Sequence, residues 1–382
     1  MPNGSRSNGA ILGLQKGVHE PGDMLSKPIL AIIKKEVSGD LRLLSSERVN
    51  LDHRHFSEYT DSDQHPVETP FENPPIPTMK KKVDDADVGI PTILRYFLDG
   101  SRKTYKVDDI IIDGKYLPII AGQVGVSIIS REDNQLTPLK PFCSFKNIIA
   151  FPNKISEEDL NHFQGVINDQ SPIKFELVHY SLKDEKDPVD LGVAKISSQM
   201  QDLEIKTVEE MAERNFLTND KMLIIDGPLR FKKKLEVVKF RNVVGLSKSF
   251  RPSYQLGKGS KKKDIGAITS ELNFGERTSV FRITEEEKTI GAWYQRIRSK
   301  SHIQNPLQGV VKMERYAVDT NEIENGLDSE TVDTISSLVM QERNVTPYGA
   351  DYRWASHIYP IYMAEIYLKC SFMSDLKFKA LF

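Results

Sequence analysis

Apolar residues along the chain gather in short runs, and three of these runs end in the dipeptide Asp-Gly, at Asp99, Asp113 and Asp226. An apolar run bounded by turn residues predicts a buried strand. The run before Asp113 is followed directly by another apolar run that reaches Val126. That arrangement predicts a hairpin with an Asp-Gly turn. The runs before Asp99 and Asp226 predict two further strands, over 93–98 and 222–225.

The pattern from Pro91 onward mixes strands and helices, which predicts one α/β domain. Apolar periodicity predicts helices over 197–214 and 361–372. Further strands are expected over 109–130, 175–180, 237–246, 278–283 and 310–316. Residues 250–264 are basic and resemble a loop.

Residues 1–85 differ from the rest of the chain. Apolar positions over 29–37 recur at helical spacing and predict one short amphipathic helix. Residues 53–78 include Pro66, Pro70, Pro74, Pro75 and Pro77, which excludes regular helix and central strand. We therefore expect an N-terminal extension with a proline-rich connector over 1–85 and the main domain over 86–382.

Composition narrows the class of protein only slightly. The chain has 382 residues, is 39% hydrophobic and 28% charged, and carries a formal net charge of -2, as in ordinary globular proteins. It has two cysteines, Cys143 and Cys370, and no CxxC motif, which argues against a disulfide framework or a thiolate zinc site. No signal peptide or transmembrane-length apolar run is found. The expectation is a cytoplasmic protein that does not enter a membrane.

Two aspartates at the ends of buried strands are candidates for one metal site. Asp99 and Asp226 could converge if their strands are neighbours, although turn aspartates are also common. The helix over 197–214 supplies a third carboxylate, because Glu204 lies within its apolar stripe. Glu209 is held in reserve for this position. The alternative is a boundary glutamate that reaches solvent.

The segment 352–365 is rich in aromatic residues and carries His357 and Glu365. Histidine is a common metal ligand, but His357 could equally be hydrogen-bonded in the core of an aromatic helix. A set of carboxylates with one histidine and no thiolate suits Mn²⁺ or Mg²⁺. Such a cluster can hold two ions for phosphodiester hydrolysis.

Basic residues near the predicted site strands suggest a nucleic-acid surface. Lysine runs occupy 232–234 and 261–263, and residues 293–298 interleave aromatics with arginines, as in a groove for a single strand. A solvated surface is the alternative for each run. The candidate DNA contacts are Lys248, Arg251, Lys261, Lys262 and Arg296.

The ordered set of these motifs resembles the NurA nucleases. It comprises Asp99-Gly100-Ser101, the glutamate-bearing helix, the run Ile-Ile-Asp-Gly-Pro-Leu at 224–229 and the C-terminal aromatic block, and it extends from about Pro91 to the C-terminus. The resemblance implies an RNase H-like, Piwi-related mixed sheet flanked by helices, here with an N-terminal extension. It implies a manganese-dependent DNA exo- or endonuclease. It also implies a homodimer that works with the hexameric ATPase HerA in DNA end resection or antiphage defence.

The same resemblance assigns residue roles. Asp99 and Asp226 match the two strand aspartates, and Glu204, or Glu209, matches the helix glutamate. Family members commonly place Tyr-Pro shortly before Ala-His, but here Tyr359-Pro360 is followed by Ala364-Glu365, and His357 comes earlier. The fourth ligand is therefore either Glu365 or His357.

The expected function is a two-metal deoxyribonuclease that uses Mn²⁺ or Mg²⁺. One alternative is a catalytically inactive NurA-like subunit that binds DNA or regulates an ATPase. RNA in a hybrid duplex is also open as a substrate, because a metal site of this kind recognises phosphates and not sugars.

Overall fold

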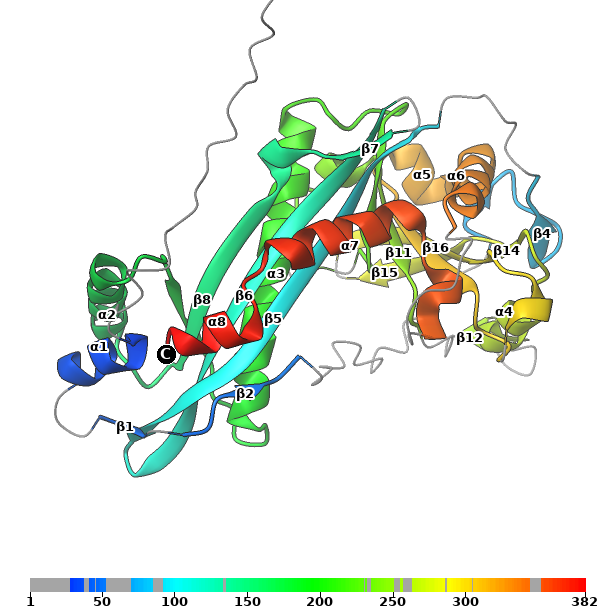
Figure 1. The fold of residues 1–382 in the computed structure, drawn as a ribbon. Helices are drawn as coiled ribbons and strands as arrows, with labels where there is room; N and C mark the ends of the chain where they lie inside the picture. Colours follow the sequence, from blue (N-terminus) through cyan, green and yellow to red (C-terminus); the bar gives the residue numbers. More distant parts are fainter. Residues whose placement is uncertain are drawn as a thin grey trace, which may run out of the picture.

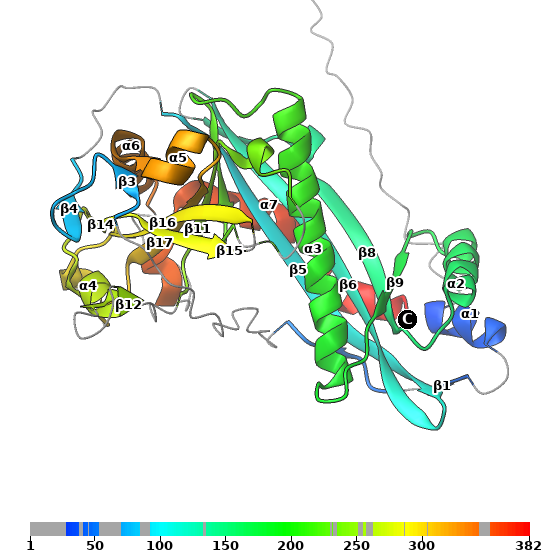
Figure 2. The ribbon, with the colours of Figure 1, turned by 180° about the vertical axis from the view of Figure 1, so that it is seen from behind.

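The computed structural model describes residues 28–37, 41–44, 46–52, 70–84, 92–132, 135–229, 231, 235–250, 255–256, 263–285, 287–303, 305–343 and 352–382. One large mixed sheet runs through the molecule, with helices on both of its faces (Figures 1 and 2). The α/β class with a mixed, helix-flanked sheet is therefore confirmed. Within the described chain, no helix is both long enough and apolar enough to cross a membrane.

The sheet has the strand order β4-β14-β16-β17-β11-β10-β5-β6-β8-β9. The strands of the half that carries the candidate site are β5 (Leu94–Ile112), β6 (Lys115–Glu132), β8 (Ser144–Pro152), β9 (Glu176–Tyr180), β10 (Met222–Asp226) and β11 (Val243–Ser247). The other half contains β17 (Val310–Tyr316), β16 (Lys288–Arg296), β14 (Glu276–Thr278) and β4 (Lys80–Lys82). Beside this path, β1 (Arg42–Leu44) and β2 (Val49–Asn50) pair with β5, β7 (Gln135–Pro138) pairs with β6, and β15 (Phe281–Glu285) pairs with β16.

The long hairpin of β5 and β6 forms as predicted. Asp113 and Gly114 join the two strands and have φ angles of 53° and 74°. Positive φ at both central residues is the geometry of a type I′ turn, whose twist matches that of the strands. The predicted end of the first strand at residue 98 is wrong, because β5 continues to Ile112. Asp99 is therefore inside a strand, and the interpretation of Asp99 as a turn residue is excluded.

The sheet splits beside β5. β10 runs parallel to β5 and pairs with it as far as Ile225 opposite Leu98, and β11 runs parallel to β10. Farther along the same edge of β5, Leu51 donates to Thr104 O and β2 pairs with Tyr105. Between these points, residues 99–103 pair with β6 on one side and with no described strand on the other. The split leaves an open edge of β5 directly after the end of β10.

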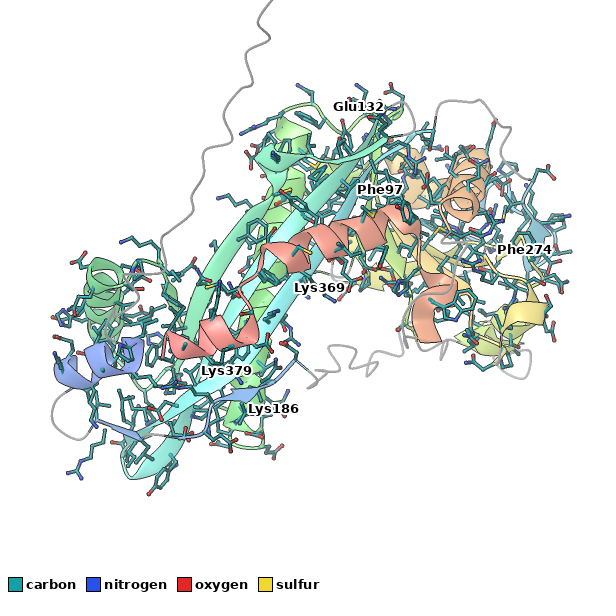
Figure 3. The ribbon with its side chains drawn as sticks, in the orientation of Figure 1. Phe97, Glu132, Lys186, Phe274, Lys369 and Lys379 are labelled. Carbon is teal, nitrogen blue, oxygen red and sulfur yellow. The ribbon has the colours of Figure 1, made fainter. Side chains whose placement is uncertain are left out.

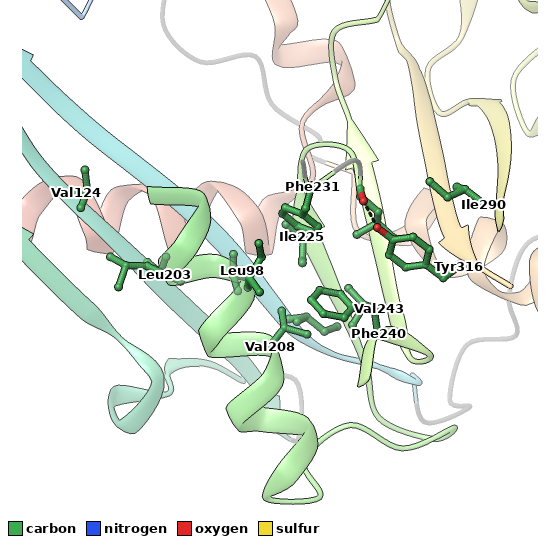
Figure 4. Packing of buried hydrophobic residues seen from close by; sticks show 14 of the residues in the cluster. Leu98, Val124, Leu203, Val208, Ile225, Phe231, Phe240, Val243, Ile290 and Tyr316 are labelled. Carbon is green, nitrogen blue, oxygen red and sulfur yellow. Dashed lines mark hydrogen bonds between the residues drawn. The ribbon is translucent and has the colours of Figure 1, made fainter. Parts of the chain in front are cut away.

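Two helices enclose this region from opposite faces. α3 (Pro188–Glu213) lies along one face, where Leu203 and Val208 belong to the same buried cluster as Leu98 and Ile225 (Figure 4). α7 (Tyr359–Ser371) crosses β5 and β6 on the other face (Figure 1). Asp187 caps α3 by accepting from the Val189 N–H at 2.9 Å, so the helix begins earlier than the predicted residue 197.

Other helices complete the fold. α1 (Ile29–Glu36) confirms the predicted N-terminal helix, and its Ile29, Ile32 and Ile33 pack in the same cluster as Tyr105 of β5. The sequence did not predict α2 (Glu157–Gln170) or α6 (Ser329–Gln341). The remaining short elements are α4 (Ile265–Glu271), α5 (Thr320–Asn325), α8 (Asp375–Ala380), β3 (Glu72–Asn73), β18 (Leu327–Asp328), β12 (Gln255–Leu256) and β13 (Lys263–Asp264).

The remaining element predictions have mixed outcomes. Strands over 175–180 and 310–316 are confirmed as β9 and β17. The strand over 237–246 is wrong in its first half, where residues 237–240 form a 3₁₀ turn before β11. The strand over 278–283 is replaced by β14 and β15. Residues 53–69 of the proline-rich connector lie outside the described residues.

Candidate functional site

Asp99 and Asp226 lie side by side on the α7 face of the sheet. Because Ile225 is opposite Leu98 in the parallel pair, Asp226 and Asp99 occupy the next register position on neighbouring strands. Such strands are about 4.8 Å apart, so side chains at the same level face each other. Asp99 is 5% exposed, and its Oδ2 has no hydrogen-bond partner among the described residues. The neighbouring strands thus meet the condition under which the two aspartates converge.

Lys248 forms an ion pair with one of these two aspartates. It directly follows β11, which is the strand beside β10, and its Nζ lies 2.7 Å from Asp226 Oδ2. Burial by itself would lower the pKa of Lys248, but the charges of Asp226, Asp99 and Glu365 raise it above its ordinary value. Lys248 is therefore a charged ammonium among carboxylates. The sequence suggests Lys248 as a DNA contact, and the structure places its ammonium within the acidic cluster.

The environment of Asp99 disfavours its charged form. Burial, followed by the charge of Asp226, holds the pKa of Asp99 well above its usual range, although Lys248 acts in the opposite direction. Glu365 and Glu204 raise this pKa further. A strongly perturbed carboxylate with specific charged neighbours is a recognised mark of a functional site.

Glu204 approaches from the opposite face. Side chains alternate along a strand, so Gly100 faces α3 where Asp99 faces α7. A Cβ atom at Gly100 would lie 2.0 Å from Glu204 Oε1, which shows that the carboxylate occupies the space that the glycine leaves. Glu204 is 6% exposed and affects the pKa of Asp99. Glu209 is half-buried and is not among the charges that shift this pKa.

The C-terminal block contributes Glu365 to the cluster. Ser127, the cross-strand partner of Asp99, donates from Oγ to Ala364 O of α7 at 2.8 Å. This bond places Glu365 near the aspartates, and its charge raises the pKa of both Asp99 and Lys248. Glu365 also forms an ion pair within α7, at 2.5 Å, with Lys369, the side chain of this helix that Figure 3 labels.

His357 precedes α7 and is buried. Its backbone N–H donates to Trp354 O at 3.2 Å, and the hydroxyl of the adjacent Ser356 donates to Val310 O at the start of β17. Glu365 thus contributes to the charge at Asp99, and the bond from Ser356 holds the segment before α7 against β17.

The donor set fits a hard divalent cation in its chemistry. Asp99, Asp226, Glu204 and Glu365 offer carboxylate oxygens, which Mg²⁺ and Mn²⁺ prefer. The unpartnered, buried Asp99 Oδ2 is a free donor for such an ion. In the described part of the chain, however, no three acidic, histidine or cysteine side chains are close enough to form a ready ligand group. The ammonium of Lys248 already accompanies Asp226, so an ion bound there would have to displace it.

Arg296 is a correction to the predicted DNA surface. It is fully buried in β16 together with Trp293 and Tyr294. Its guanidinium donates to Leu272 O at 2.5 Å, to Gln308 O at 3.0 Å and to Pro306 O. Since these carbonyls take up its donors in the interior, Arg296 is not a DNA contact. Arg251, Lys261, Lys262 and residues 232–234 lie outside the described residues.

No protein-family model matches the chain, and no curated protein is significantly similar to it. The class of the protein is therefore described from its fold and its site alone. The protein is an α/β protein with a partly buried cluster of carboxylates and one lysine beside the carboxyl ends of two parallel strands.

Proposed function

We propose that the chain is a metal-dependent DNA nuclease of the RNase H-like, NurA-related type. One observation carries the proposal. Asp99 and Asp226 lie side by side where the sheet splits, and α3 and α7 each add a carboxylate from opposite faces. In α/β proteins, ligands bind outside the carboxyl ends of the strands, at the point in the sheet where the strand order reverses. An antiparallel meander extended by parallel strands also supports an RNase H-like core.

The residues present can perform the necessary steps. A bound Mn²⁺ or Mg²⁺ would supply Lewis acidity and an activated water. Asp99 and Asp226 would hold it, with Glu204 and Glu365 at the periphery of the site. Asp99 would give up a proton on binding, because metal ligands must be deprotonated. Lys248 would then leave Asp226 and bind a phosphate oxygen of the nucleic acid as a point charge.

The biological setting follows from the resemblance alone. On that basis we propose a homodimer acting with a HerA-type ATPase, in DNA end resection or antiphage defence, in the cytoplasm. A HerA-type gene adjacent to this one would support the partnership.

The test is degradation of end-labelled linear and single-stranded DNA with Mn²⁺, with and without EDTA. The variant Asp226→Asn should lose cleavage while it retains the fold. Asp113→Asn is a matched control, because it changes the same Asp-Gly dipeptide at an exposed hairpin turn away from the cluster. Cleavage that survives Asp226→Asn, or that is lost equally in Asp113→Asn, would contradict the assignment.

A second function is favoured by the ion pair of Lys248 with Asp226. A lysine that neutralises a ligand aspartate is also what an inactive, DNA-binding subunit of an ATPase complex would show. Isothermal titration with Mn²⁺ separates the two functions. Binding that Asp226→Asn removes supports the nuclease. A folded protein that binds no Mn²⁺ and cleaves nothing, with or without the ATPase and ATP, supports the inactive subunit.

A further inference from the structure

A pocket of about 160 Å³ opens beside the acidic cluster. Its walls come from the end of β11, from the loop before β17 and from the turn before α7, and they include Lys248, Phe250, Asn305, Leu307 and Ser356. Lys248 lines this pocket and also contacts Asp226, so the pocket and the acidic cluster share one side chain. Whatever occupies the pocket therefore lies next to the proposed position of the phosphate.

The apolar wall of the pocket includes the aromatic ring of Phe250, which another aromatic side chain contacts. Phe250 packs against Tyr294 of β16, with 4.7 Å between the ring centroids and 45° between the ring planes. Tyr294 is fully buried, which fixes the ring of Phe250 from behind. Leu307 adds a second apolar surface. An aromatic ring held in this way in the wall of a pocket is suited to stacking on a flat ligand.

The polar wall is a loop held in one conformation. Asn305 Oδ1 accepts the backbone N–H groups of Leu307 and Gln308, at 3.1 and 2.9 Å. This leaves the amide nitrogen of Asn305 as its donor group. From the other side, Arg296 donates to the carbonyls of Pro306 and Gln308. The buried arginine that the sequence suggested as a DNA contact instead supports the wall of this pocket.

We propose that this pocket seats one unpaired base of a nucleic-acid strand whose neighbouring phosphate lies against Lys248. The assignment rests on the proposed nuclease function and adds how the strand is held. The volume supports it, because a cavity of about 150 Å³ accepts one benzene ring. A base pair does not fit, so the strand must be single at this position, or its base must leave the stack, at a cost of a few kcal/mol. Frayed or single-stranded ends are therefore the favoured substrate.

The test measures binding separately from cleavage. Fluorescence anisotropy in EDTA follows a short single-stranded DNA that carries one abasic site, which is moved along the strand. With the wild-type protein, one abasic position should weaken binding about 5- to 150-fold, the range given by base–aromatic stacking. Phe250→Leu keeps an apolar side chain against Tyr294 but removes the ring, so this position dependence should disappear. Phe250→Tyr keeps the ring and should retain it.

Phe145→Leu is the matched control. Phe145 is also partly exposed, but it lies on β8, across β6, β5 and β10 from the pocket. Strand binding with no position dependence, or with the same dependence in Phe250→Leu, would overturn the base pocket and leave the nuclease proposal standing. Absence of both strand binding and cleavage would overturn both. Position-dependent binding without cleavage would retain the pocket and contradict only the nuclease.

Discussion

Gly100 allows the position of Glu204 to be tested without changing any carboxylate. The three atoms nearest to an added Cβ are Glu204 Oε1, Cδ and Cγ, at 2.0, 2.9 and 3.2 Å. In Gly100→Ala, therefore, the atoms that must shift belong to the Glu204 side chain and not to the backbone. Replacing glycine within a strand by alanine gains about 0.5–1 kcal/mol. Extra volume in a packed site costs about 1–3 kcal/mol. The net change in unfolding free energy should be a loss of at most about 2.5 kcal/mol.

Activity should respond more strongly than stability. A displacement of about 1 Å in a catalytic arrangement can cost about a hundredfold in rate. We expect Gly100→Ala to lower metal-dependent cleavage by about that factor while the protein remains folded. In the background of Glu204→Ala the clash is absent. Gly100→Ala should then add no further loss of cleavage and should raise the unfolding free energy by about 0.5–1 kcal/mol.

Urea denaturation and cleavage rates of the four proteins in this cycle provide the measurement. Gly122→Ala is the control on the same face, because its Cβ would meet Ile196 Cγ2 of α3 at 2.9 Å. It would also meet a backbone atom, Lys103 O, at 2.8 Å. This variant should lose stability in either background. If Gly100→Ala destabilises the protein equally with and without Glu204, the carboxylate does not occupy this space. If cleavage is unaffected, Glu204 has no role in the reaction.

Four further predictions test the charges. Asp99→Asn should stabilise the metal-free protein increasingly as pH rises above about 4. The raised pKa of Asp99 means that the folded wild type binds this proton more tightly than the unfolded chain does, so the wild type loses stability when Asp99 is deprotonated. Equal effects of the substitution on urea denaturation at acid and alkaline pH would contradict this. Lys248→Met should increase the thermal stabilisation produced by Mn²⁺, since the ammonium no longer competes for Asp226; an unchanged or smaller Tm shift would oppose it. Arg277→Met should lower the unfolding free energy, measured by urea denaturation, by about 3–5 kcal/mol. The reason is that it removes the guanidinium 2.8 Å from the fully buried carboxylate of Glu72, a described residue of the N-terminal extension. A loss below about 1 kcal/mol would show that this pair does not anchor the extension. Glu365→Gln should lower cleavage more than His357→Gln, because Glu365 contributes to the charge at Asp99; the reverse order would return His357 to the site.

Local patterns predicted those features that depend on neighbours in sequence. The type I′ turn at Asp113 and Gly114, the helix α1 and the strands β9 and β17 follow from turn residues and apolar spacing. The neighbouring placement of the two aspartates needed one further condition, the order of strands in the sheet. That order depends on long-range packing, which no local pattern encodes.

The features that the sequence did not place have the same origin. Arg296 lies in a segment whose arginines and aromatics are typical of a DNA contact, but backbone carbonyls from two loops accept its hydrogen bonds in the interior. Lys248 is suggested as a DNA contact from its place beside the strand that ends near Leu246, and the parallel pairing of β10 and β11 brings its ammonium to Asp226. The sequence leaves Glu365 and His357 open as the fourth ligand because that choice depends on how α7 docks, and the bond from Ser127 to Ala364 places Glu365 near Asp99.

The three Asp-Gly dipeptides have the same sequence, but their glycines have different roles in the structure. Gly114, at a φ of 74°, serves the hairpin turn, and Gly227, at 125°, lets the chain leave the end of β10. Gly100 lies within a continuous strand, and its role is steric, because any side chain there would displace Glu204. In the first two cases glycine serves the backbone, and in the third it admits a carboxylate from the far face of the sheet. A glycine within a strand, directly after a buried aspartate and opposite a glutamate-bearing helix, is therefore a stronger sign of a converging acidic site than the dipeptide itself.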